Sequence, residues 1–290
     1  MYLVNYKTRW YACLAARAIE VSRIGAAMQF AIAVAVGLVV SSIGFKKFVW
    51  FISLGYGFSM AAIGVALLIL FAGRADPASI ALCLLLVVYG LRLGGYLALR
   101  ERRSAAYNHV MKTQVKDGSD MALPLKVVIW ATCAVLYACE AAPVIFRLTN
   151  GAGTDACAVA GAAIMAAGII LESASDLQKT AQKKANPHRF CDKDLFSFVR
   201  CPNYLGEVIA WTGMFISGFT ALQGPLQWAA ALFGWIGIVY VMFGGARRLE
   251  IRQNKNYGAD PEYRVYVKRT PILLPFVPLY SVEKYTWLKG

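Results

Sequence analysis

The densest group of ionisable residues in this chain lies between Leu171 and Trp211. Its first part, LESASDLQKTAQKK, has charged residues at spacings of +4, +3 and +4, which share one face of a helix: Glu172, Asp176, Lys179 and Lys183. Such a stripe can be a solvated face with weak ion pairs. Glu172 and Asp176 follow a long apolar run, however, where ionised groups are costly, and this favours a ligand-binding face.

A second group follows directly in LFSFVRCPNYLGEVIAWTG. Pro202 suits the first position of a helix, so we expect a helix to begin there. Glu207 would then lie about one turn inside an apolar span, where a carboxylate indicates a functional site. The alternative is a glutamate that pairs with Arg200 or Lys183 only to hold the helices together. One face of this helix carries polar and aromatic residues at every fourth position: Asn203, Glu207 and Trp211, with Tyr204 beside them.

A third stripe runs through VVYGLRLGGYLALRERR at intervals of +3, +4, +4 and +3: Tyr89, Arg92, Tyr96, Arg100 and Arg103. At about 1.5 Å per residue, Arg92 lies about 12 Å from Arg100 along the helix axis. That depth is too great for simple snorkelling to the membrane surface, so Arg92 is expected to have a buried partner or a ligand. Tyr89 and Tyr96 are also compatible with ordinary packing.

Glu140, within YACEAAP, is a further acid inside an apolar run. An ionisable residue at membrane depth is a candidate site residue by default. The alternative for Glu140 is a place at the lipid interface, in the outer half of its span.

Metal and common nucleotide motifs are missing from the sequence. The chain has seven cysteines without a CxxC pair and only two histidines, so we expect no metal site. No GxGxxG follows a predicted strand, and no GxxxxGK[ST] is present. Membrane helices and basic loops would therefore have to bind any nucleotide.

The elements that position these residues are apolar helices. The chain has 290 residues, of which 59% are hydrophobic and 16% charged, whereas soluble domains carry about a quarter charged residues. A helix needs about 20 apolar residues to cross a bilayer. We therefore predict an all-α polytopic membrane protein with about seven spans: Gly25–Gly44, Val49–Gly73, Pro77–Leu99, Leu123–Phe146, Ala156–Leu171, Tyr204–Ala221 and Pro225–Gly244.

Lysine and arginine follow the odd-numbered spans, and the net charge is +14. The positive-inside bias then places the C-terminus in the cytoplasm and the N-terminus outside, although the basic residues before the first span oppose this. Anionic lipid attracts such loops. Their dispersion argues against nucleic acid as a partner. The membrane would be a bacterial inner membrane or the endoplasmic reticulum.

These runs resemble the steroid 5α-reductase family of membrane enzymes. The resemblance covers roughly the last two-thirds of the chain, and its pieces are Asn203-Tyr204-x-Gly206-Glu207 with the upstream Val199-Arg200-x-Pro202, Glu172-x-x-x-Asp176, Tyr89-x-x-Arg92, Arg248-x-Glu250, Tyr263-x-x-Tyr266 and Pro271-x-x-x-Pro275-Phe276.

The resemblance implies NADPH bound from the cytoplasmic side and reduction of a carbon–carbon double bond conjugated to a ketone. Tyr89 would polarise the ketone of a 3-oxo-Δ4 steroid or similar lipid enone. Residues 25–146 would form the substrate part and 147–290 the NADPH part, after an N-terminal segment, 1–24. No obligatory protein partner is expected. The implied cofactor-binding residues are Arg103, Glu172, Asp176, Lys183, Arg200, Asn203, Tyr204, Glu207, Arg248 and Asn254.

The chain also departs from the family pattern. Steroid-reducing relatives pair the tyrosine with an early glutamate, but the second span here contains no acid. Glu140, or else Glu20, is the candidate catalytic acid in its place; the alternative is that the carbonyl is activated in another way.

Three other functions remain open. An isoprenylcysteine-type methyltransferase also places a Pro-x-Tyr-x-Gly motif near a nucleotide-like cofactor. A sterol reductase would act on an isolated double bond. A transporter is the non-enzyme alternative, although no internal repeat of the kind that transporters often carry is visible.

Overall fold

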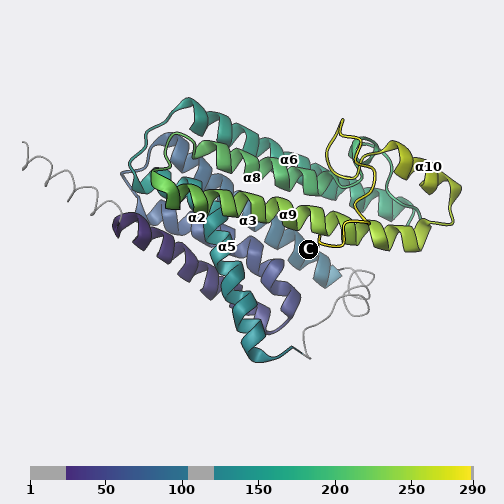
Figure 1. Ribbon diagram of the computed structural model, residues 1–290, viewed down its shortest axis with the longest axis horizontal. Helices are drawn as coiled ribbons and strands as arrows, with labels where there is room; N and C mark the ends of the chain where they lie inside the picture. Colours follow the sequence, from purple (N-terminus) through teal and green to yellow (C-terminus); the bar gives the residue numbers. More distant parts are fainter. Residues whose placement is uncertain (1–23, 104–120, 289–290) are drawn as a thin grey trace, which may run out of the picture.

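The computed structural model describes residues 24–103 and 121–288, and these ranges contain helices but no strand (Figure 1). The predicted N-terminal segment therefore lies outside the described residues, apart from Ile24. A first helix covers residues 24–41. It is followed by η1 (Ser42–Phe45), η2 (Phe48–Ile52), α2 (Leu54–Leu70), α3 (Pro77–Arg103), α5 (Leu123–Thr149), α6 (Ala156–Ala185), α7 (Leu195–Phe198), α8 (Pro202–Ser217), α9 (Gly224–Tyr257) and α10 (Pro261–Arg269).

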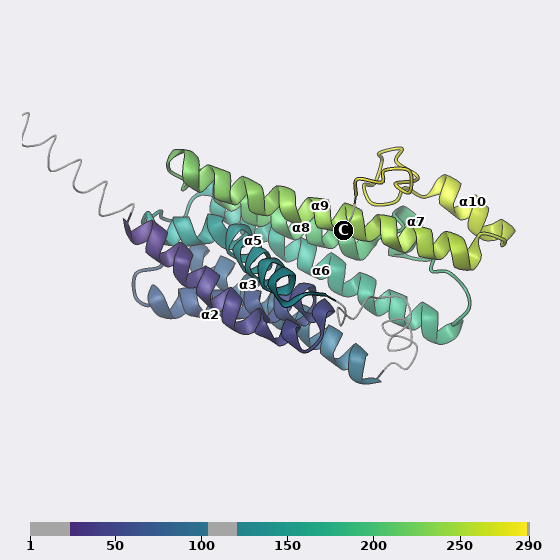
Figure 2. The ribbon, with the colours of Figure 1, turned by 60° about the horizontal axis from the view of Figure 1, so that its bottom comes forward.

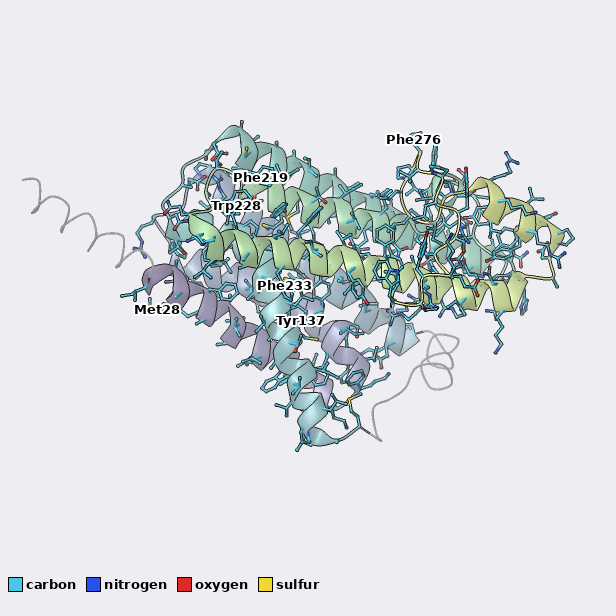
Figure 3. All side chains as sticks on the ribbon, in the orientation of Figure 1. Met28, Tyr137, Phe219, Trp228, Phe233 and Phe276 are labelled. Atoms are coloured by element: carbon cyan, nitrogen blue, oxygen red, sulfur yellow. The ribbon has the colours of Figure 1, made fainter. Side chains whose placement is uncertain are left out.

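Six helical segments among the described residues are long and apolar enough to cross a membrane: Ile24–Phe45, Phe48–Leu70, Pro77–Arg103, Leu123–Thr149, Ala156–Ala185 and Gly224–Tyr257. The prediction of an all-α polytopic membrane protein is therefore confirmed. Large apolar side chains cover the outside of the bundle, as lipid contact requires. Met28 and Phe233 are 54% and 56% exposed (Figure 3).

The predicted sixth span, Tyr204–Ala221, differs from the other six. It corresponds to α8, which has 16 residues and is about 24 Å long, less than a hydrocarbon core of about 30 Å. Of the about seven predicted spans, six are long enough to cross a membrane among the described residues, and the sixth in order, α8, is a shorter seventh helix. The helix α8 begins at Pro202 and ends at Ser217. The chain then turns, and Gly224, which has a φ of +68°, lies at the end of this turn.

Three helices continue beyond their apolar parts toward the same end of the bundle. The helices α3, α6 and α9 extend to Arg103, Ala185 and Tyr257 at the end that carries α10 (Figure 1). The extension of the fifth span as helix was predicted. The last span was predicted to end at Gly244, but α9 continues to Tyr257, because Arg, Leu, Glu, Gln and Lys after that glycine are good helix formers.

The bundle has two groups of helices, α2 with α3 and α6 with α8 and α9, and α5 packs against both (Figure 2). Glycines bring α6 and α8 into backbone contact. A Cβ atom on Gly206 would lie 2.7 Å from Glu172 N and 2.8 Å from Gly168 O, closer than real side chains come. Small residues at such crossings are typical of membrane helices. This crossing fixes the depth of Glu207 relative to Glu172.

The segment after α10 folds back over the start of α8. Arg200 N and Cys201 N donate to the carbonyl oxygens of Pro271 and Ile272, at 2.9 and 3.0 Å. Ile272 and Leu273 are fully buried there in a second small apolar core. Phe276 lies at the tip of this segment, 97% exposed, and points away from the bundle (Figure 3).

Candidate active site

Tyr89 of α3 and Glu207 of α8 meet in the middle of the bundle. The Tyr89 hydroxyl lies 2.6 and 2.8 Å from the two Glu207 carboxylate oxygens. The indole N–H of Trp211, one turn along α8, donates to Glu207 at 3.0 Å. Tyr56 of α2 brings its hydroxyl within 2.9 Å of the Tyr89 hydroxyl. Three helices thus place four hydrogen-bonding side chains in one cluster.

Aromatic rings enclose this cluster. The Tyr89 and Trp211 ring centroids are 5.3 Å apart, and the Tyr56 ring lies 6.0 Å from Tyr89 and 5.2 Å from Tyr137. Tyr89 is 0% exposed and Trp211 is 2% exposed. Electrostatic interactions are stronger in such a site than in water because the effective dielectric constant is lower.

One turn further along α3, Arg92 forms ion pairs with two acids of α6. Its guanidinium contacts Glu172 and lies 2.5 Å from Asp176. The side chains of Arg92, Glu172 and Asp176 are 17%, 4% and 11% exposed. The expectation that Arg92 has a buried partner is confirmed. Because Tyr89 and Arg92 are three residues apart, the ion-pair cluster adjoins the hydroxyl–carboxylate cluster.

Positively charged side chains lie between these acids and the end of the bundle that carries α10. Arg100, Arg248 and Arg252 act electrostatically on the Tyr204 hydroxyl, and Lys179 interacts with Arg100 and Arg252. Lys179, Arg248 and Arg252 have no carboxylate within ion-pair distance in the part of the chain that the structure describes. Such a group of cations suits a phosphorylated ligand.

Asn203 begins the face of α8 that leads from these cations to Glu207. Its side-chain oxygen is buried and accepts no hydrogen bond from the described residues. A buried amide oxygen without a donor is costly, so this atom is available to a ligand.

Four other predicted cofactor residues make different contacts. Lys183 donates to the Tyr257 hydroxyl at 2.9 Å and to Arg189 O at 2.5 Å. Arg200, 1% exposed, pairs with Glu250 at 2.9 Å beneath the C-terminal segment. The remaining two lie at helix ends on the basic side: Arg103 is exposed, and Asn254 contacts Glu283 and Tyr263.

Glu140 does not bond to Tyr89 in the structure, in which Glu207 is the carboxylate partner of that tyrosine. Glu140 is instead 3% exposed on α5, and neither of its oxygens has a hydrogen-bond partner among the described residues. Burial at this level rules out the lipid-interface alternative. Glu20 lies outside the described residues.

Sequence reasoning missed Tyr56 and Arg252. Tyr56 lies in LGYGF without a charged residue nearby, and no periodicity distinguishes it from a packing aromatic. Arg252 follows Arg248 by one helical turn, so the length of α9 was the signal that would have included it. Within the described ranges, no three His, Cys, Asp or Glu side chains are grouped closely enough to hold a metal ion.

Comparisons with known proteins name no activity. A family model described as "Protein of unknown function (DUF1295)" matches residues 28–270. A protein of Schizosaccharomyces pombe (strain 972 / ATCC 24843), described as "Uncharacterized protein C594.04c", is 33% identical over 81 residues, which are 28% of this chain and 22% of that protein. No solved structure matches. Since the family model covers most of the chain, the protein belongs to the DUF1295 family.

Proposed function

We propose that the protein is an NADPH-dependent reductase of the carbon–carbon double bond of a lipid enone, such as a 3-oxo-Δ4 steroid. The observation that carries this proposal is the Tyr89 hydroxyl, bonded to Glu207 inside an aromatic enclosure. A tyrosine hydroxyl beside an acid suits a ketone oxygen that becomes negatively charged during reaction. Fixed donors of this kind are usually the largest single contribution to catalysis.

The residues around this cluster fit a phosphorylated dinucleotide. Lys179, Arg248 and Arg252 would bind its phosphates, since none of them has a carboxylate within ion-pair distance among the described residues. Asn203, with its unpaired side-chain oxygen, would bind a donor group such as a carboxamide N–H. When bound, NADPH would supply the hydride that enone reduction needs.

The hydroxyl–carboxylate cluster has a definite proton arrangement. Tyr56 can donate to the Tyr89 oxygen, which leaves the single Tyr89 proton for either Glu207 or a ketone oxygen. Trp211 lies one helical turn from Glu207 on α8, and its indole N–H donates to the Glu207 carboxylate and holds it in place. As negative charge grows on the ketone, the Tyr89 hydrogen bond to it strengthens. The surrounding rings keep water away from that charge.

The test is NADPH oxidation by detergent-purified protein with progesterone or testosterone. We expect Tyr89→Phe to lower kcat by about 100-fold or more while NADPH affinity stays within about twofold, because an oxyanion donor is lost. Glu207→Gln is expected to weaken NADPH binding about tenfold. Tyr285→Phe, in the C-terminal segment, is the matched control and should behave as wild type, because Tyr285 is not among the hydrogen-bond partners of Tyr89 or Glu207.

Unchanged kinetics in both variants would overturn this site. Binding of S-adenosylmethionine instead of NADPH would indicate the isoprenylcysteine-type methyltransferase. Reduction of an isolated sterol double bond would indicate the sterol reductase. Substrate-dependent flux in liposomes without NADPH oxidation would indicate the transporter.

A further inference from the structure

The segment after α10 returns to α9 and runs along it toward the apolar part of the bundle (Figures 1 and 2). Glu283 O accepts from the Arg247 side chain at 2.9 Å, and Trp287 O accepts from the Tyr240 hydroxyl at 2.8 Å. As the residue number rises in the segment, the number of its partner on α9 falls. The last described residues therefore lie beside the apolar part of α9.

The contact of Trp287 with α9 lies on the apolar side of the first charged residue of that helix. From Gly224 to Ala246, α9 has no charged side chain. At about 1.5 Å per residue this stretch is roughly 34 Å long, enough to cross a hydrocarbon core of about 30 Å. Tyr240 precedes Arg247, the first charged residue, by about 10 Å along the helix. A ring beside Tyr240 would therefore lie near the boundary between acyl chains and headgroups.

The Trp287 ring has the surroundings of a tryptophan at a membrane surface. It is 64% exposed and stacks on the exposed ring of Tyr240, with the ring centroids 6.1 Å apart. Tryptophan and tyrosine are enriched at this depth, because the ring contacts acyl chains while its N–H or O–H group reaches water. In water, this much exposed indole surface is unfavourable, whereas lipid would cover it.

A second exposed aromatic ring, Phe276, belongs to the same segment. It is 97% exposed and points away from the bundle, at its side rather than beyond its end (Figure 3). The neighbouring Val277 is exposed as well. The segment that carries both is fixed to the start of α8, since Arg200 N donates to Pro271 O at 2.9 Å.

The start of α8 lies near the same membrane boundary. Gly206 of α8 packs against Glu172 of the antiparallel helix α6. Glu172 is about 24 Å from Ala156, where α6 begins, and Pro202 lies about 6 Å further along the bundle. Together these distances reach about 30 Å, the thickness of a hydrocarbon core. Both exposed rings of the segment thus belong to the level of one membrane surface.

We infer that residues 271–288 form an interfacial membrane anchor, in which Trp287 and Phe276 insert their rings into the lipid bilayer beside the bundle. The partner of this surface is the lipid at the boundary between headgroups and acyl chains. Lys268 and Arg269, just before the segment, are exposed and have no carboxylate within ion-pair distance among the described residues, so they suit headgroup phosphates. The inference does not depend on the proposed reaction.

The anchor would also hold the start of α8. Arg200 N and Cys201 N donate to the carbonyl oxygens of the segment, and Glu250 accepts from both the Arg200 side chain and Val282 N. These bonds open when the segment leaves the bundle. Lipid contact at the two rings should therefore slow hydrogen exchange at the residues from which α8 and its candidate cofactor face begin.

The first test places Trp287 relative to the bilayer. The full-length protein, labelled with fluorotryptophan, is reconstituted in phosphatidylcholine nanodiscs and studied by fluorine NMR, and Trp287→Phe identifies the Trp287 resonance by its loss. We expect a lipid with a nitroxide just below its headgroup to remove most of the intensity of this resonance, and a water-soluble gadolinium chelate to leave it. The resonance of Trp211, buried in the bundle, should survive both. Survival of the Trp287 resonance with the nitroxide lipid, or its loss with the chelate, would overturn the inference.

The second test uses hydrogen exchange in the same nanodiscs, followed by mass spectrometry. Phe276 is so exposed that Phe276→Ser would be neutral if the ring lay in water. We expect this variant to speed exchange at Arg200 and Cys201 about tenfold, because the ring loses its burial in lipid. Val265→Ser, at an exposed apolar residue of α10 at the far end of the bundle (Figure 1), is the matched control and should exchange as the wild type does. Unchanged exchange in Phe276→Ser, or the same increase in both variants, would overturn the insertion of Phe276.

Discussion

The Tyr89 hydroxyl on α3 lies 2.6 Å from a Glu207 oxygen on α8, although 118 residues separate them in the sequence. The glutamate of the NYLGE motif therefore contacts the tyrosine that the family resemblance assigns to the substrate ketone. This hydrogen bond joins the predicted substrate part of the chain, which contains Tyr89, to the predicted cofactor part, which contains Glu207. Changes at either residue should be felt at the other.

We expect Tyr89→Phe and Glu207→Gln to be strongly coupled. Tyr89→Phe leaves the buried Glu207 carboxylate with one hydrogen bond fewer. Glu207→Gln exchanges the hydrogen bond from Tyr89 to a carboxylate for a weaker one to an amide oxygen, so loss of the Tyr89 hydroxyl should cost less in that background. A double-mutant cycle on the free energy of unfolding in detergent should give a coupling energy of about 1–3 kcal/mol. Glu207→Gln combined with Tyr285→Phe is the control pair and should be additive. Additivity in the first pair as well would mean that the hydrogen bond does not form.

Arg92→Met should destabilise the protein by about 3–5 kcal/mol, because it leaves Glu172 and Asp176 buried without their cation. The measurement is thermal or denaturant unfolding in detergent. Adding Glu172→Gln should recover part of the loss by removing one buried charge. Breaking the exposed Arg189–Glu262 pair with Glu262→Gln should cost less than about 1 kcal/mol. Equal effects at the two sites would contradict the burial of Arg92.

Gly206→Ala should destabilise the α6–α8 crossing by about 2–4 kcal/mol, because the new Cβ atom would lie 2.7 Å from Glu172 N. NADPH binding should weaken as well, since the same crossing sets the position of Glu207. Gly95→Ala on α3 is the matched control. No atom lies within 4 Å of its Cβ position, so this helical glycine should gain up to about 1 kcal/mol. A tolerated Gly206→Ala would show that the two helices lie further apart.

We expect the stability of the protein to depend on pH through Asp155, which precedes α6 at the end of the bundle opposite α10. Partial burial acts to raise its pKa, but hydrogen bonds from Ala158 N, Thr220 and Arg147, with the charge of Arg147, hold the pKa at about 2. The unfolded value is about 3.9. Because the folded pKa is the lower one, the stabilisation is complete above about pH 4 and is lost as the pH falls toward 2.

The measurement is the melting temperature of wild type and Asp155→Asn between pH 7 and pH 2. The wild type should melt higher at neutral pH, because asparagine keeps the helix cap but not the charge that faces buried Arg147. The difference should close below about pH 4. A difference that does not change with pH would rule out ionisation of Asp155 as its source.

The amino-acid sequence by itself determined the helices of the bundle. The starts at Pro77, Leu123 and Ala156 were predicted at the residues where the structure has them. A run of about 20 apolar residues forms a helix in a membrane because every backbone group must be satisfied within the segment. The need of Arg92 for a buried partner followed from its depth alone, which depends only on the rise per residue.

Only the tertiary structure decided which side chains meet. Glu207 was expected on a cofactor face, and its contact with Tyr89 depends on the rotation and depth of two helices that close packing at Gly206 and its neighbours sets. The same holds for Arg200, which pairs with Glu250 once the last segment folds back. Hydropathy is a local property of the chain, whereas these contacts join residues far apart in it, so no pattern within one helix could have predicted them.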